Sequence, residues 1–141
     1  KAHIAALQER DPADPWGKLG DPESMQAGVI ALTRTVVHCA DLVGQALPWH
    51  LASRWGNAAL QEFQAQAEEE EARGLPITPH MQGLSEEGVR SKVQKGFLTF
   101  VVLPLWCAFS RLVPETKVFV DNLNQNILKY DEQLSLTVGG C

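Results

Sequence analysis

The chain has 141 residues, of which 45% are hydrophobic and 21% charged, and its formal net charge is −5. This composition is ordinary for one folded domain with a sizeable core, and it excludes a disordered or collagen-like chain. Lysines and arginines are scattered rather than clustered. A nucleic-acid polymer is therefore a poor partner, and a small anion would need metal ions to bind.

The cysteines, Cys39, Cys107 and Cys141, have no metal-ligand spacing and are odd in number, which favours a reducing compartment. No signal peptide is evident, and the longest apolar run, 96–110, contains Pro104 and is shorter than the roughly 20 residues of a membrane span. We expect a soluble cytoplasmic protein without a membrane span. Because the chain starts inside an expected helix and without methionine, we expect a fragment of a longer protein.

The first ten residues are expected to end a helix, which stops at Asp11-Pro12 because a residue before proline avoids the helical conformation. Residues 11–21 contain two Asp-Pro pairs and are predicted to form a loop that Trp16 anchors on the core. Asp21-Pro22-Glu23 is typical of a helix start.

The helix that starts there is predicted to bury one apolar seam, formed by Met25, Val29, Leu32, Val36 and Cys39. Asp41 follows at its end, on the same helical face as His38. Taken alone, this acid favours a solvated carboxylate, because buried acids are rare. The alternative is a metal ligand held by a packed helix.

A second long helix is predicted over 51–73, opened near Pro48 and closed by Gly74 and Pro76. Its apolar stripe is interpreted as core packing and comprises Leu51, Trp55, Ala59 and Phe63. The connection 74–88, rich in glycine and proline, could shape the mouth of a pocket. His80 within it is expected to be exposed, with ligand contact as the alternative.

A third long helix is predicted from Ser85 to about Val113, kinked near Pro104 and buried nearly all round from 97 to 109. Gln94 is unusual there, because a buried amide needs partners. It either bonds a neighbouring helix or reads the edge of a planar ring stacked on Phe97, which lies three residues on.

The last predicted helix ends at Leu134, with its asparagines outward, and 135–141 is expected to be a loose tail. Its inward face is predicted to carry Phe119, Leu123, Ile127, Tyr130 and Leu134. The sequence has no strand pattern, internal repeat or phosphate-binding glycine loop. The predicted fold class is therefore all-α, with one domain over 1–134.

From about His38 to Leu112 the sequence resembles the C-terminal part of the catalytic domain of class I cyclic nucleotide phosphodiesterases. The resemblance rests on Asp41-Leu42, Gly44, Pro48, Trp55, Glu62-Phe63, Gly74-Leu75-Pro76 and Gln94-Lys95-Gly96-Phe97, in that order. It implies a compact multi-helix catalytic domain, of which 1–134 would be the C-terminal portion.

The resemblance also implies a chemistry. In such enzymes a zinc ion and a magnesium or manganese ion share a hydroxide that attacks the cyclic phosphorus of cAMP or cGMP and releases the 5′-nucleotide. Asp41 matches the last acid of the metal set, Gln94 the glutamine that binds the purine, and Phe97 the aromatic clamp over it. Further pocket-lining positions are matched by Leu42, Trp55 and Leu60.

Part of the machinery has no match. The other metal ligands and the general-acid histidine find no counterpart among His3, His38, His50 and His80, so the resemblance assigns no catalytic residue to this chain. We expect the chain alone to be inactive and the missing part to precede Lys1. Departures from the family pattern are Val43-Gly44, Gln66-Ala67-Glu68 and the small residues Gly56 and Ala59.

Two hypotheses follow. The full-length protein is a cyclic nucleotide phosphodiesterase, or it is a catalytically degenerate relative that serves as a nucleotide-binding or protein-interaction scaffold. Bound zinc in the purified full-length protein would discriminate between them, because a scaffold has no reason to retain it. The preference for cAMP or cGMP, any regulatory domain, and assembly into a homodimer or larger oligomer are left open.

Overall fold

The computed structural model describes residues 2–16, 18 and 20–138, with the side chains of residues 2, 3 and 138 excepted. Over these residues the chain is helical and has no strand, which confirms the predicted all-α class. The α-helices are α1 (Ala2–Gln8), α2 (Pro22–Leu42), α3 (Trp49–Ala72), α4 (Glu87–Phe97), α5 (Leu103–Leu112) and α6 (Lys117–Val138). Shorter helical segments are η1 (Val43–Ala46), η2 (Pro79–Met81), the π-helical η3 (Leu98–Val102) and η4 (Pro114–Thr116).

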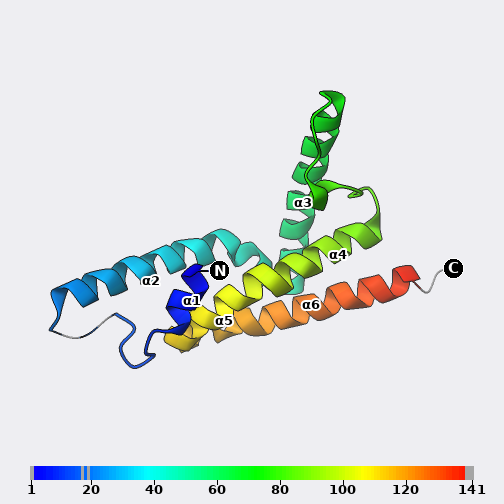
Figure 1. Cartoon of the computed structure of the whole chain (residues 1–141). Coiled ribbons are helices and arrows are strands. Elements are labelled where there is room, and N and C mark those ends of the chain that lie inside the picture. Colours follow the sequence, from blue (N-terminus) through cyan, green and yellow to red (C-terminus); the bar gives the residue numbers. More distant parts are fainter. Residues whose placement is uncertain (1, 17, 19, 139–141) are drawn as a thin grey trace.

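The segments α4, η3 and α5 form one long helical rod, and the other helices are arranged around it. Figure 1 shows α4, η3 and α5 following one another in a line alongside α6, while α3 projects steeply away from this pair. The main core lies where the rod meets α6 and is built around Leu98, Val102, Leu105 and Leu123, each fully buried. A smaller cluster, centred on Leu60, joins α3 to the connection that follows it.

The start of α2 is as predicted, but its buried face is not. Asp21 caps the helix, because its Oδ1 accepts hydrogen bonds from the backbone N–H groups of Glu23 and Ser24 at 3.2 and 3.4 Å. The predicted seam is wrong at Met25, Val29 and Val36, which are exposed. The buried stripe instead comprises Gly28, Leu32, Thr35 and Cys39.

Thr35 explains part of this shift. Its hydroxyl donates to the carbonyl oxygen of Ala31, one turn earlier in α2, at 2.8 Å. A threonine satisfied by its own helix can be buried at little cost, so the inward face need not follow the largest apolar residues.

The buried stripe of α3 also differs from the prediction. It comprises Ala52, Gly56, Leu60 and Ala67, whereas Trp55, predicted as core, is 61% exposed. Trp16 does not anchor its loop either, since it is 58% exposed. Instead, the Arg10 guanidinium donates a hydrogen bond to the carbonyl oxygen of Pro15 at 3.2 Å, and this bond holds the loop in place.

Further corrections concern the last two long helices. The kink expected near Pro104 is a π-helical turn, η3, and all-round burial is wrong for Phe100 and Val101, which are 79% and 41% exposed. In α6 the asparagines do not all face outward, because Asn126 is only 1% exposed. The helix also continues past Leu134 to Val138, and 139–141 lie outside the described residues.

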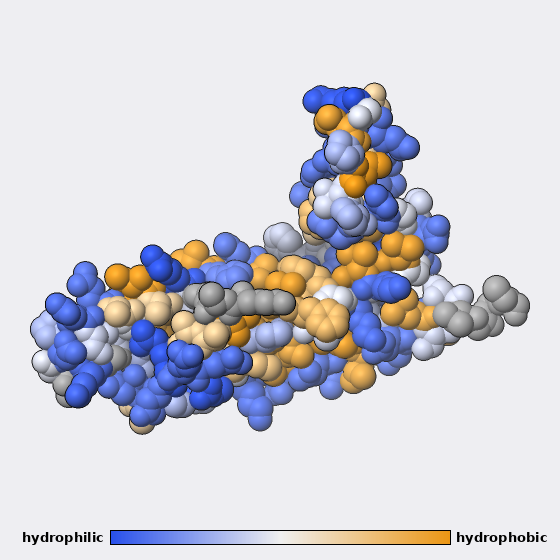
Figure 2. All heavy atoms as spheres, viewed as in Figure 1, coloured by the Kyte–Doolittle hydropathy of each residue, from blue (hydrophilic) through white to orange (hydrophobic). Residues whose placement is uncertain are grey.

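Apolar side chains remain at the surface of α2 and η3. Figure 2 shows hydrophobic residues along α2 and over the middle of the molecule. By length and composition alone, Pro22–Ala46 and Glu87–Leu112 could each cross a membrane. Because the core helices of globular proteins meet the same criterion, the predicted lack of a membrane span stays a prediction.

Candidate functional site

A cleft of about 630 Å³ lies between the end of α2, η1, α3, η2 and the α4–η3 segment, and its walls are mostly apolar. The metal and substrate residues suggested by the sequence all line it: Asp41, Leu42, Trp55, Leu60, Gln94 and Phe97. The structure therefore brings together residues from three separate helices. Their roles in binding stay predictions.

Asp41 provides the cleft with a carboxylate that is available for a ligand. It lies in the last turn of α2 and is exposed, and its carboxylate forms no ion pair or hydrogen bond with the part of the chain that the structure describes. No group of three or more His, Cys, Asp or Glu residues is placed to hold a metal ion within residues 2–16, 18 and 20–138. One carboxylate fits the role of a single metal ligand, and a complete site would need others from elsewhere.

Gln94 makes the contact with a neighbouring helix that was one of the alternatives considered for it, while base reading stays a prediction. It is 5% exposed, and its Nε2 donates to the backbone carbonyl oxygen of Gly56 in α3 at 2.9 Å, so it does bond a neighbouring helix. It also lines the cleft, and its Oε1 is buried without a partner among the described residues. Only the amide nitrogen can donate to a carbonyl, so this hydrogen bond fixes which way the amide points.

Gly56 makes this arrangement possible. A Cβ added there would lie 3.1 Å from Gln94 Cδ and 3.1 Å from the hydroxyl oxygen of Tyr130. Both distances are shorter than ordinary van der Waals contact, so a larger residue would push the amide away from the α3 backbone. The departure from the family pattern at this position is thus tied to how Gln94 is held.

Aromatic side chains line the cleft together with Gln94. Phe97 is half-buried, one helical turn further along α4, and Trp55 faces the cleft from α3. His80 is exposed, as expected, yet it also lines the cleft and packs edge-on against Phe63 with ring centroids 5.7 Å apart. Such walls suit a flat heteroaromatic ring, which gains from stacking on its faces and from hydrogen bonds at its edge.

Sequence reasoning missed Gln45, which also lines the cleft. It lies in η1, is 9% exposed, and its Oε1 is buried without a partner among the described residues. An unmet buried acceptor typically costs about 1–3 kcal/mol. A polar residue directly before the apolar Ala46-Leu47 pair was the available signal, but a four-residue 3₁₀ turn has no periodicity to reveal its orientation.

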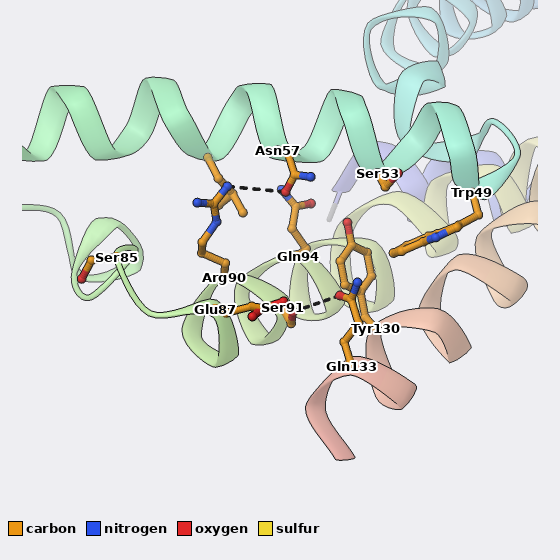
Figure 3. Close-up of a pocket in the computed structure, with 11 residues that line it drawn as sticks. Trp49, Ser53, Asn57, Ser85, Glu87, Arg90, Ser91, Gln94, Tyr130 and Gln133 are labelled. Carbon is orange, nitrogen blue, oxygen red and sulfur yellow. Dashed lines mark hydrogen bonds between the residues drawn. The ribbon is translucent and has the colours of Figure 1, made fainter. Parts of the chain in front are cut away.

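A second, more polar cavity of about 360 Å³ lies on the other side of Gln94, between α3, α4 and α6. Figure 3 shows Ser91 and Gln133 joined by a hydrogen bond there, at 3.1 Å, and Arg90 directed toward Asn57. Burial raises the pKa of Tyr130 to about 12, so its hydroxyl stays protonated at neutral pH. Gln94 and Leu60 line both cavities, so they form part of the partition between them.

The cysteines give no support for a thiolate nucleophile. Cys39 is buried, Cys107 is exposed, and both are free thiols. Burial raises the pKa of Cys39 to about 12 and also raises the pKa of Cys107. Both thiols are therefore protonated at neutral pH. Cys141 lies outside the described residues.

Comparisons with known proteins point to one family. The model of the 3′5′-cyclic nucleotide phosphodiesterase family matches residues 6–123. A Caenorhabditis elegans relative named probable 3′,5′-cyclic phosphodiesterase pde-3 is 30% identical over 118 residues, which are 79% of this chain and 17% of the relative. A Drosophila melanogaster relative named 3′,5′-cyclic-AMP phosphodiesterase, isoform F, is 33% identical over 98 residues, which are 69% of this chain and 14% of the relative.

The fold has a solved counterpart. The phosphodiesterase domain of the RhoPDE fusion protein from the choanoflagellate Salpingoeca rosetta superposes with a TM-score of 0.82 at 24% identity. The match covers 98% of this chain and 42% of that domain. The present chain thus spans less than half of the solved domain and a smaller share of the full-length relatives.

Proposed function

The chain belongs to the 3′,5′-cyclic nucleotide phosphodiesterase family, and from this premise we propose that the full-length protein hydrolyses the cyclic phosphodiester of a purine nucleotide to the 5′-nucleotide. The observation that carries the proposal is the single cleft shared by Asp41 and Gln94. A carboxylate at one position and a base-reading amide at another are what a cyclic nucleotide needs from this part of the domain.

Within this chain, Asp41 is the residue that we propose to bind a metal ion. Its exposed carboxylate would hold a divalent ion, which we propose to be one of a zinc and magnesium (or manganese) pair. When bound, such ions would lower the pKa of a bound water, so that a hydroxide is available at neutral pH, and would neutralise charge on the phosphate. This suits a chain of net charge −5 without a basic cluster. The remaining ligands would come from the rest of the full-length protein.

We further propose that adenine is preferred over guanine. The bond to Gly56 leaves Gln94 Oε1 as the unpartnered acceptor, and the exocyclic amine of adenine is a donor that would satisfy it. Guanine has a carbonyl oxygen in place of that amine. Rotating the amide to meet it would set the Gln94 oxygen against the Gly56 oxygen, with no proton between them. The relatives named cyclic-AMP phosphodiesterases support the same preference.

The exposed apolar side chains of α2 and η3 support placement of this chain within a larger helical domain. Val36, Val37 and Phe100 are 50%, 56% and 79% exposed, more than is usual for residues of this size near the centre of a molecule. Further helices of the same domain would cover them. The cytoplasmic location stays a prediction.

The deciding experiment uses the full-length protein. Asp41→Ala should abolish metal-dependent hydrolysis of cAMP and lower the bound zinc. The melting temperature of the metal-free protein should stay nearly unchanged, because Asp41 is exposed. Asp121→Ala, at an exposed acid on α6, is the matched control. Unchanged turnover in Asp41→Ala would refute the role of Asp41. Wild-type protein that binds cAMP but neither turns it over nor retains zinc would favour the degenerate scaffold.

A further inference from the structure

Gln45 is a buried polar residue whose side chain has no protein partner within the described part of the chain. It is 9% exposed, and no hydrogen bond to its amide is formed by residues 2–16, 18 and 20–138. An apolar side chain of similar size would fill this space without leaving a polar group unmet. Gln45 also lines the cleft, so a ligand that enters the cleft could supply the missing partner.

The backbone under Gln45 is held in place by α6. Asn126 Nδ2 donates to the carbonyl oxygens of Gln45 and Leu47 at 3.0 and 2.9 Å, and Asn122 Nδ2 donates to that of Ala46 at 3.0 Å. Because these bonds connect η1 to a long helix, the side chain of Gln45 extends from a backbone segment whose position is already fixed. Fixed backbone of this kind is what a binding residue needs in order to discriminate between ligands.

Gln45 and Gln94 line the same cleft from different elements, η1 and α4, and each has a buried Oε1 without a partner among the described residues. Each of these two cleft-lining residues thus has an unmet amide oxygen, which is an acceptor. An exocyclic amine on an aromatic ring carries two N–H donors, one for each oxygen. A carbonyl at the same ring position carries none.

We propose that Gln45 is a specificity-determining residue whose amide oxygen accepts the second N–H of the exocyclic amine of a bound aminopurine nucleotide. This inference rests on the proposed function, since it concerns the same cleft and a purine ligand. It adds a residue that the resemblance did not assign. It also makes recognition of the amine depend on two side chains from separate elements.

The test compares Gln45→Met, which keeps the length of the side chain and removes its polar atoms, with Gln61→Met at an exposed position of α3. Binding of cAMP and of cyclic inosine monophosphate, which has a carbonyl in place of the amine, is measured by calorimetry on chelator-treated full-length protein. Gln45→Met should weaken cAMP binding about threefold to tenfold and leave cyclic inosine monophosphate unchanged. Gln61→Met should change neither.

Each outcome is informative. An unchanged ratio of the two affinities in Gln45→Met would overturn the role of Gln45, whether both affinities stay at the wild-type value or both fall by the same factor. A wild type that neither binds cAMP in this assay nor hydrolyses it when metal ions are present would instead refute the proposed function. If the variant does not fold, the Gln45 side-chain amide resonance of isotopically labelled wild type serves as the second readout. It should shift with cAMP and not with cyclic inosine monophosphate, and no shift with cAMP would refute the proposal.

Discussion

Replacing Gly56 by alanine tests how the Gln94 amide, which we propose reads the base, is held. The added Cβ would lie 3.1 Å from Gln94 Cδ, 3.2 Å from Gln94 Nε2 and 3.1 Å from the Tyr130 hydroxyl oxygen. Relieving this overlap should cost about 1–3 kcal/mol of folding free energy. The better helix propensity of alanine offsets about 1 kcal/mol of that cost. We expect a net destabilisation of about 0–2 kcal/mol, together with displacement of Gln94 from the Gly56 carbonyl oxygen.

The substitution should also weaken binding of the ligand. A displaced amide no longer presents its oxygen to the base, and losing about 1.4 kcal/mol of binding free energy corresponds to a tenfold weaker affinity for cAMP. Calorimetric binding and thermal unfolding of the full-length protein measure the two effects separately. Gly88→Ala is the matched control, because its Cβ would meet nothing closer than 3.7 Å. Wild-type cAMP affinity in Gly56→Ala would refute the reasoning.

Two further predictions concern α6. Asn126→Leu leaves the buried carbonyl oxygens of Gln45 and Leu47 without their donor. Urea denaturation should therefore show a loss of about 2–5 kcal/mol of unfolding free energy. A loss below about 1 kcal/mol would mean that water replaces the amide. Burial raises the pKa of Tyr130 from 10.0 to about 12, so the unfolded chain ionises first as pH rises. The difference in unfolding free energy between wild type and Tyr130→Phe should therefore be constant below pH 10. From pH 10 toward pH 12 the wild type should lose stability relative to the variant. A difference that does not change with pH would contradict this burial.

Local signals in the sequence located the helices well. The Asp21 cap, the proline at Pro48 and the glycine at Gly74, which has φ +68°, act within a few residues of a helix end, so each is readable without knowledge of the fold. The positions of Asp41, Gln94 and Phe97 around one cleft also followed from the sequence, but through the resemblance to a family rather than from periodicity.

Burial was harder to predict. The apolar pattern of α2 favoured Val29 and Val36 as core, yet both are exposed, and Trp55 of α3 is exposed as well. A sequence pattern records which side chains are apolar, whereas the neighbouring helices decide which face is covered. The prediction that Asn126 faces outward was wrong for another reason. Its burial depends on hydrogen bonds to backbone carbonyl oxygens about 80 residues earlier in the chain.

The sequence by itself determined the all-α class, the approximate starts of the long helices and the family, because these depend on short-range backbone preferences and on the order of a few residues. Only the tertiary structure decided that Gln94 bonds the carbonyl oxygen of Gly56, that Gln45 lines the same cleft, and that a polar cavity lies behind the amide. These features join residues far apart in the chain, and a hydrogen bond of 2.9 Å exists only once α3 and α4 have packed against each other.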